Sequence, residues 1–133
     1  MFSTFVALPP AVVVHGLADA LAALAPGWPV TLLSAPAAAV WAGVGWWQAL
    51  VQAAAAAQPS TSHHDILDCG ASPGRAMAAL RMGQRIIILD PACPAFARVA
   101  SLGAIVLTQR PPALDLAARG AERQLAAWLN TRV

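Results

Sequence analysis

The sequence predicts an α/β protein in which helices cover a mainly parallel sheet. The main observation is a sequence pattern that recurs along the chain: a short apolar run, a small or acidic residue, a proline and then a helix-like stretch. Because proline at the first helical position costs no hydrogen bond, a proline soon after a strand marks a strand-to-helix turn. Strands that alternate with helices are typical of parallel sheets. The copies of this pattern begin at Val30, Asp65, Arg85 and Ala104.

The expected strands are short apolar runs rich in β-branched residues. Such continuous runs suit strands that are buried on both faces of a parallel sheet. The first run ends at His15–Gly16, where the pattern changes. The expected strands are Ala11–Val14, Val30–Leu33, Asp65–Leu67, Arg85–Leu89 and Ala104–Leu107.

The expected helices follow these strands and end at glycine or proline signals. Pro26–Gly27 ends the first helix, and Gly83 and Gly103 close two later ones. In the last helix, apolar residues spaced three or four apart from Leu114 onward form one stripe. The expected helices are Leu17–Ala25, Pro36–Ala57 with a candidate break at Gly43–Gly45, Pro73–Met82, Pro94–Leu102 and Leu114–Leu129.

These elements predict a single domain over residues 1–133, a three-layer α/β/α sandwich with a five-stranded, mainly parallel sheet. A chain of 133 residues is long enough to bury a substantial core. The alternation fits a flavodoxin-like or Rossmann-like type, for which we expect the strand order 2-1-3-4-5 and right-handed crossovers. Ligands in such sheets bind beyond the carboxyl ends of the strands.

Charge and cysteine content limit the classes of partner. The net charge is only +2, and the arginines are spread over the second half of the chain, so no nucleic-acid partner is expected. The N-terminus lacks a basic region before its apolar stretch, which argues against a secretory signal. Two cysteines do not make a disulfide framework, so we expect a cytoplasmic location.

The expected helix over residues 36–57 is apolar on more than one face. Proline, glycine and glutamine residues interrupt it, so we expect a buried or interface helix and no membrane span. A helix that is apolar all round is buried all round, and tryptophan is favoured in interface cores, which predicts a homodimer. The alternative is that the break at Gly43–Gly45 lets both sets of tryptophans enter one core. The candidate interface residues are Trp41, Trp46, Trp47 and Leu50.

A parallel sheet brings the polar residues that follow its strands to one edge. Asp68 and Asp90 end the third and fourth expected strands, which we expect to be neighbours. Such a pair of carboxylates can hold Mg²⁺ or bind ribose hydroxyls. The alternative is that each aspartate caps the following helix. The residues expected at this edge are His15, Ser34, Asp68, Cys69, Asp90, Cys93, Thr108, Gln109 and Arg110.

The loop Gly70–Gly74 has the small residues of a phosphate cradle at a helix start, and Arg75 adds a charge beside it. The alternative for this loop is tight-turn geometry alone.

His15 is placed for acid–base chemistry, and its alternative role is that of a hydrogen-bonded polar residue at the core edge. The cysteines match no zinc spacing, so we expect buried, unreactive thiols and assign neither a metal ligand nor a catalytic residue. The candidate ligand-binding residues are His15, Asp68, Gly70, Gly74, Arg75 and Asp90.

The segment Asp65–Gly74 resembles the first motif of Rossmann-type S-adenosylmethionine-dependent methyltransferases, especially the RNA-directed ones. In that family the strand ends in Leu-Asp, a Gly/Ala/Pro/Gly loop holds the methionine part of the cofactor, and an acidic residue after the next strand holds the ribose. The resemblance implies cofactor contacts at Asp68, Gly70, Gly74 and Asp90. The resemblance extends over residues 65–90, about a fifth of the chain. Two strand–helix units precede the motif here, and no catalytic motif of that family follows it.

The sequence leaves two functions open. The first is binding of a small nucleotide-like or phosphorylated ligand at the carboxyl edge, with S-adenosylmethionine or a nucleotide as the candidate cofactor. Methyltransferase activity follows only from the resemblance. The second is a non-catalytic, homo-oligomeric assembly module that uses the tryptophan-rich helix.

Overall fold

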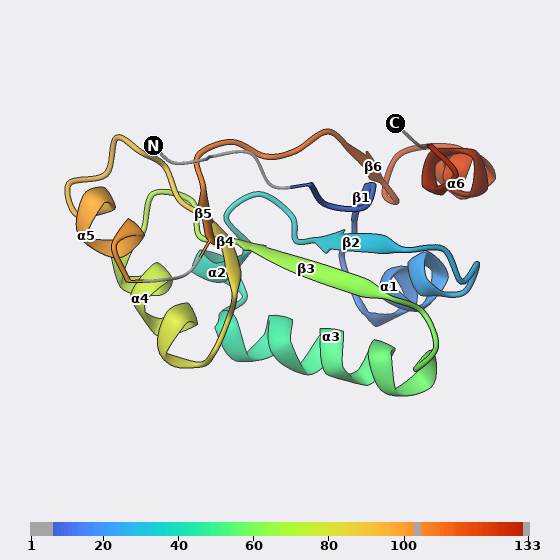
Figure 1. Cartoon of the computed structure of the whole chain (residues 1–133), viewed down its shortest axis with the longest axis horizontal. Coiled ribbons are helices and arrows are strands. Elements are labelled where there is room, and N and C mark those ends of the chain that lie inside the picture. Colours follow the sequence, from blue (N-terminus) through green and yellow to red (C-terminus); the bar gives the residue numbers. More distant parts are fainter. Residues whose placement is uncertain (1–6, 103–104, 132–133) are drawn as a thin grey trace. The chain divides into compact units, whose positions relative to one another are not determined.

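The computed structural model describes residues 7–102 and 105–131, in which helices alternate with strands (Figure 1). The chain is an α/β protein, as the sequence predicts. The strands are β1 Ala11–Val13, β2 Val30–Leu33, β3 His63–Asp68, β4 Ile86–Ile88, β5 Ile105–Leu107 and β6 Ala113–Asp115. The helices are α1 Leu17–Leu24, α2 Ala38–Trp41, α3 Val44–Ala57, α4 Pro73–Arg81, α5 Phe96–Ala100 and α6 Ala121–Leu129.

Within the described residues the strands form a six-stranded sheet in the order β5-β4-β3-β2-β1-β6. β1 pairs in parallel with β2 and β6, and β4 pairs in parallel with β3 and β5. The prediction of five strands in the order 2-1-3-4-5 is therefore wrong. Hydrophobic pattern identifies a strand but does not choose its neighbours, because pairing depends on contacts between residues far apart in the chain.

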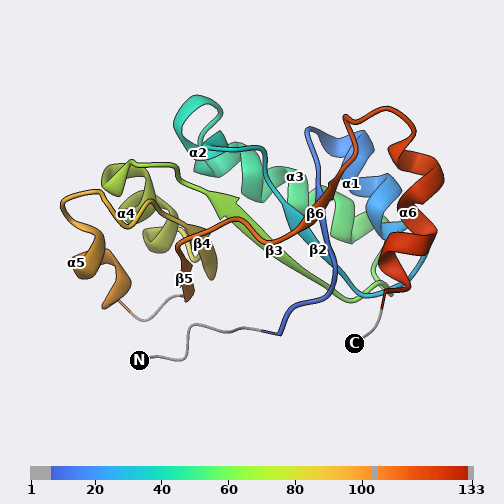
Figure 2. The same ribbon diagram turned by 90° about the horizontal axis from the view of Figure 1, so that it is seen from above.

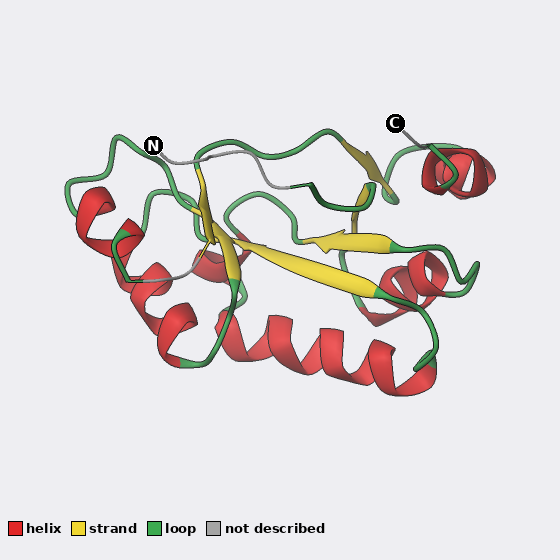
Figure 3. Cartoon of the chain, viewed as in Figure 1, coloured by secondary structure: helices red, strands yellow, loops and turns green. Residues whose placement is uncertain are grey.

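The sixth strand replaces the first part of an expected helix. The prediction of a helix over Leu114–Leu129 is wrong at its start, since Ala113–Asp115 pair in register with Ala11–Val13. Parallel pairing with β1 overrides the helix preference of alanine and leucine in this short stretch. Asp115 Oδ1 then accepts the Ala117 N–H at 2.8 Å, and α6 begins only after Gly120. A loop, with no helix, joins β5 to β6 (Figure 3).

Most other boundaries follow local signals in the sequence. The candidate break in the long helix is confirmed: α2 ends at Trp41, Gly43 has φ +94°, and α3 begins at Val44. α2 begins at Ala38, two residues later than expected, because Ala37 is in the left-handed region with φ +55°. α4 begins at Pro73 as expected, and α5 begins two residues after Pro94. Residues 103 and 104, part of the expected turn and fifth strand, lie outside the described residues.

Contacts divide the chain into two compact units. Unit 1 comprises residues 1–33, 50–65 and 111–133, and unit 2 comprises residues 34–49 and 66–110. Val12, Leu32 and Leu129 are buried in unit 1, where Trp128 Nε1 also donates to the Ala11 carbonyl at 2.7 Å. The single domain inferred from chain length stays a prediction.

Unit 2 carries the candidate ligand-binding loops on a core of its own. Leu67, Ile87 and Leu89, on or directly after its strands, have no exposed surface. α4 and α5 pack against each other in this unit (Figure 2). Among the helices of the described residues, none has both the length and the apolar character needed to cross a membrane.

Candidate functional site

The candidate site lies in unit 2, where the loops after β3 and β4 meet. The two strands are parallel neighbours, as expected, with Asp68 opposite Ile88. Beyond the strands, the Cys69 N–H donates to the Ile88 carbonyl and the Asp90 N–H donates to the Gly70 carbonyl, each at 2.8 Å. These backbone bonds hold the first residues after β4 against the glycine-containing loop after β3.

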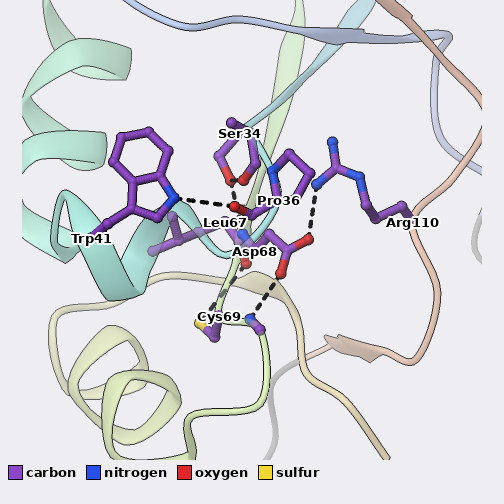
Figure 4. Close-up of polar contacts among 9 residues, drawn as sticks. Ser34, Pro36, Trp41, Leu67, Asp68, Cys69 and Arg110 are labelled. Atoms are coloured by element: carbon purple, nitrogen blue, oxygen red, sulfur yellow. Dashed lines mark hydrogen bonds and ion pairs between the residues drawn. The ribbon is translucent and has the colours of Figure 1, made fainter.

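Asp68 is buried and both of its carboxylate oxygens accept hydrogen bonds (Figure 4). Oδ1 accepts the Gly70 N–H at 2.8 Å, and Oδ2 accepts from Arg110 Nη1 at 2.8 Å. The Asp68 N–H itself donates to Ser34 Oγ at 3.0 Å. Because Ser34 follows β2 and Arg110 lies after β5, Asp68 ties together segments that end three different strands.

Asp90 has the opposite environment, although it lies just beyond the neighbouring strand. It is exposed, and its Oδ1 accepts the Ala92 N–H at 2.9 Å. Neither Asp68 nor Asp90 caps a helix, because each accepts the N–H of the residue two positions ahead; Ser72 is the N-cap of α4. In the described part of the chain, no group of three or more histidine, cysteine or acidic side chains could hold a metal ion.

The two loop glycines have different structural roles. Gly70 has φ +59°, and a Cβ at this position would lie 3.0 Å from the Ala37 Cβ. Glycine is therefore required at position 70 both by conformation and by packing against the segment before α2. Gly74 lies in the first turn of α4 and is exposed, and a Cβ at position 74 would meet no atom within 4 Å. Arg75 is exposed beside it, and its N–H donates to Ser72 Oγ at 3.1 Å.

Both cysteines are buried and free, as expected for structural thiols. Burial, with a smaller effect from the Asp68 carboxylate, raises the pKa of the Cys69 thiol from 9.0 to about 12. The thiolate is the nucleophilic form of cysteine, so burial favours the less reactive thiol form of Cys69 at neutral pH.

His15 lies in unit 1, whereas the other candidate ligand-binding residues lie in unit 2. Its Nε2 is 2.7 Å from Asp115 Oδ1, and its backbone N–H donates to Asp19 Oδ2 at 2.9 Å. Both side chains of the His15–Asp115 pair are well exposed, so the pair contributes at most about 1 kcal/mol to stability. Sequence reasoning missed Asp115 as a partner because it placed this residue in a helix.

The candidate interface residues separate into buried and exposed side chains. Trp47 and Leu50 are buried within the chain, and Trp46 is partly buried. Trp41 is 63% exposed, and its Nε1 donates to the Pro36 carbonyl at 3.2 Å. Of the four candidate interface residues, Trp41 on α2 is therefore the one with most of its surface exposed, and the other three lie on α3.

The comparisons with known proteins give no match: none with protein-family models, with curated proteins or with solved structures. The resemblance of Asp65–Gly74 to a methyltransferase motif stays an expectation. The sequence also placed Arg110 at this edge without a role, and the structure makes it the ion-pair partner of Asp68.

Proposed function

We propose that unit 2 binds a small nucleotide-like ligand at the carboxyl ends of β3 and β4. The observation that carries the proposal is the contrast between Asp68, which is buried with both oxygens occupied, and Asp90, which is exposed. The Ala92 N–H donates to one oxygen of Asp90, and a carboxylate offers about four acceptor sites. Ribose hydroxyls are donors that an acidic residue accepts at the strand ends of nucleotide-binding α/β proteins.

Local backbone geometry supports the position of Asp90. Its N–H donates to the Gly70 carbonyl, so the carboxylate is held beside the loop that leads into α4. The first N–H groups of a helix attract anionic groups, and the exposed Arg75 adds a positive charge in the same turn. A ligand with a diol and an anionic group matches these neighbours.

S-adenosylmethionine carries the same adenosine diol as a nucleotide and is the cofactor that the resemblance implies. If the resemblance holds, the activity of the bound protein is methyl transfer. The three-layer, flavodoxin-like or Rossmann-like arrangement expected from the sequence has its ligand sites at this edge.

Thermal unfolding in the presence of AMP, ATP or S-adenosylmethionine, each with and without Mg²⁺, tests the proposal. A ligand at 100 times its Kd adds about 2.7 kcal/mol to the stability of the folded state, which raises Tm by several degrees. Asp90→Asn keeps the turn acceptor but loses the charge, and should remove the rise. The matched control Glu122→Gln neutralises an exposed carboxylate on α6 and should leave it. No rise with any compound, or a rise that Asp90→Asn preserves, contradicts the proposal.

A second candidate function is homodimeric assembly. It is favoured by two exposed apolar side chains, Trp41 and Val40, of which Val40 is 44% exposed. Contiguous exposed apolar surface is typical of interaction sites, and these two residues are consecutive on α2. Sedimentation equilibrium distinguishes the outcomes: a dimer that Trp41→Ser converts into a monomer supports assembly, and a monomer at high protein concentration excludes it.

A further inference from the structure

We infer that Trp41 is the stacking platform for the base of the bound nucleotide, which narrows the ligand class to compounds with an aromatic base. The inference rests on the proposed function, because it places the base beside the same loop that carries Gly70. Three observations support it: the contacts of the Trp41 ring within the chain, its large exposed surface, and the packing of α2, the helix that ends at Trp41, against the loop after β3.

The ring of Trp41 is exposed but makes two contacts within the chain. Its only polar atom, Nε1, donates to the Pro36 carbonyl at 3.2 Å. Its ring centroid lies 6.2 Å from that of Trp46, at an interplanar angle of 42°. A ring restrained by such contacts loses less conformational entropy than an unrestrained one when a flat ligand stacks on it.

The helix that ends at Trp41 packs directly on the candidate site. A Cβ on Gly70 would lie 3.0 Å from the Ala37 Cβ and 3.8 Å from Val40 Cγ2, so α2 and the residue before it lie against this loop. Figure 4 shows Trp41 and Arg110 on opposite sides of the contact between Ser34 and Asp68. The edge therefore has an exposed aromatic ring on one side, and on the other a guanidinium that is paired with Asp68.

An exposed aromatic ring on the helix that packs against this loop suits a ligand with a flat base. Base–aromatic stacking is tolerant of base identity, because every base has a π face. The Trp41 indole N–H is used within the chain, so the ring offers its face and not a donor. The structure thus assigns recognition of an aromatic base to Trp41 and leaves the ribose to Asp90.

Titration calorimetry with AMP and with S-adenosylmethionine, on the wild type and four variants, tests the inference. Trp41→Ala should weaken binding by between about 5-fold and 150-fold, the range for loss of one stacked base. Trp41→Phe keeps an aromatic face and should retain most of the affinity. Met82→Ala, which truncates another exposed apolar side chain of unit 2, is the matched control and should change nothing. Asp90→Asn should weaken binding independently of the ring.

The outcomes separate the inference from the function on which it rests. If neither compound binds the wild type, both fail. If binding is lost in Asp90→Asn but unchanged in Trp41→Ala, the function stands and stacking on Trp41 is excluded. If Trp41→Ala leaves affinity unchanged and instead dissociates a dimer in sedimentation, the ring belongs to a subunit interface. Similar losses in Trp41→Ala and Met82→Ala would show a general effect of exposed apolar surface and also overturn the inference.

Discussion

Replacement of Arg110 by methionine removes the cation beside the buried carboxylate of Asp68. Methionine has a long apolar side chain, so the stem of Arg110 is largely replaced while the guanidinium is lost. Asp68 would keep the Gly70 N–H bond but lose the 2.8 Å bond from Arg110 Nη1. Its side chain is only 6% exposed, so water has little access to the oxygen left without a partner.

The expected loss of stability follows from these exposures. Removing one partner of a fully buried ion pair costs about 3–5 kcal/mol, and a hydrogen bond to a charged group contributes about 1.5–3 kcal/mol. The Arg110 side chain is 28% exposed, so the pair is not fully desolvated. We therefore expect Arg110→Met to lower the free energy of unfolding by about 2–3 kcal/mol. For a chain of this length the corresponding fall in Tm is about 6–12 °C.

Urea unfolding followed by circular dichroism measures this loss. The wild type, Arg110→Met, Asp68→Asn and the double variant form a cycle, in which we expect a coupling of at least about 1 kcal/mol because the side chains are in contact. Arg75→Met makes the same replacement at an exposed position and should change stability by no more than about 0.5 kcal/mol. A loss in Arg110→Met no larger than in Arg75→Met, or a coupling near zero, would refute the reasoning.

Two further predictions concern the loop after β3. Gly70→Ala should lower the free energy of unfolding in urea by about 2–3 kcal/mol, because alanine is strained at φ +59° and its Cβ would lie 3.0 Å from that of Ala37. Gly74→Ala should leave stability unchanged or raise it by up to about 1 kcal/mol. Equal effects of the two substitutions would contradict the packing described for this loop. Burial raises the pKa of Cys69 to about 12 in the folded state, so above pH 9 the unfolded chain releases this proton first and stability falls with pH by up to about 1.4 kcal/mol per unit. The contribution is fully present below pH 9 and is lost as the pH rises toward 12. Because the chain lacks lysine and tyrosine, unfolding in reductant between pH 8 and 10.5 is free of the titration of those side chains. Cys69→Ala should remove this fall and Cys93→Ala should keep it, so a fall that survives in Cys69→Ala refutes the assignment.

Local chemistry in the sequence was enough to predict the fold class and several element boundaries. β2 has the expected limits, and α4 begins at Pro73 because proline suits the first helical position and Ser72 accepts a hydrogen bond as N-cap. β6 could not be predicted in this way. Ala113–Asp115 have no strand preference of their own, and they are extended because they pair with β1, about a hundred residues earlier.

The candidate site was predictable at the level of the sheet edge but not of side-chain partners. A parallel arrangement of β3 and β4 brings Asp68 and Asp90 to neighbouring strand ends, as the sequence implied. The different environments of the two aspartates depend on Arg110, 42 residues after Asp68, and no local pattern encodes that ion pair. The difference in exposure between the tryptophans has the same cause, since tertiary packing buries Trp47 and leaves Trp41 exposed.

Chemical-shift mapping of the ¹⁵N-labelled protein during titration with AMP, and separately with S-adenosylmethionine, tests ligand binding at this edge most directly. We predict saturable shifts of the Gly70, Asp90 and Ala92 amides and of the Trp41 indole N–H. An unchanged spectrum with both compounds at millimolar concentration would contradict ligand binding here, and so would shifts confined to the surroundings of His15 and Asp115.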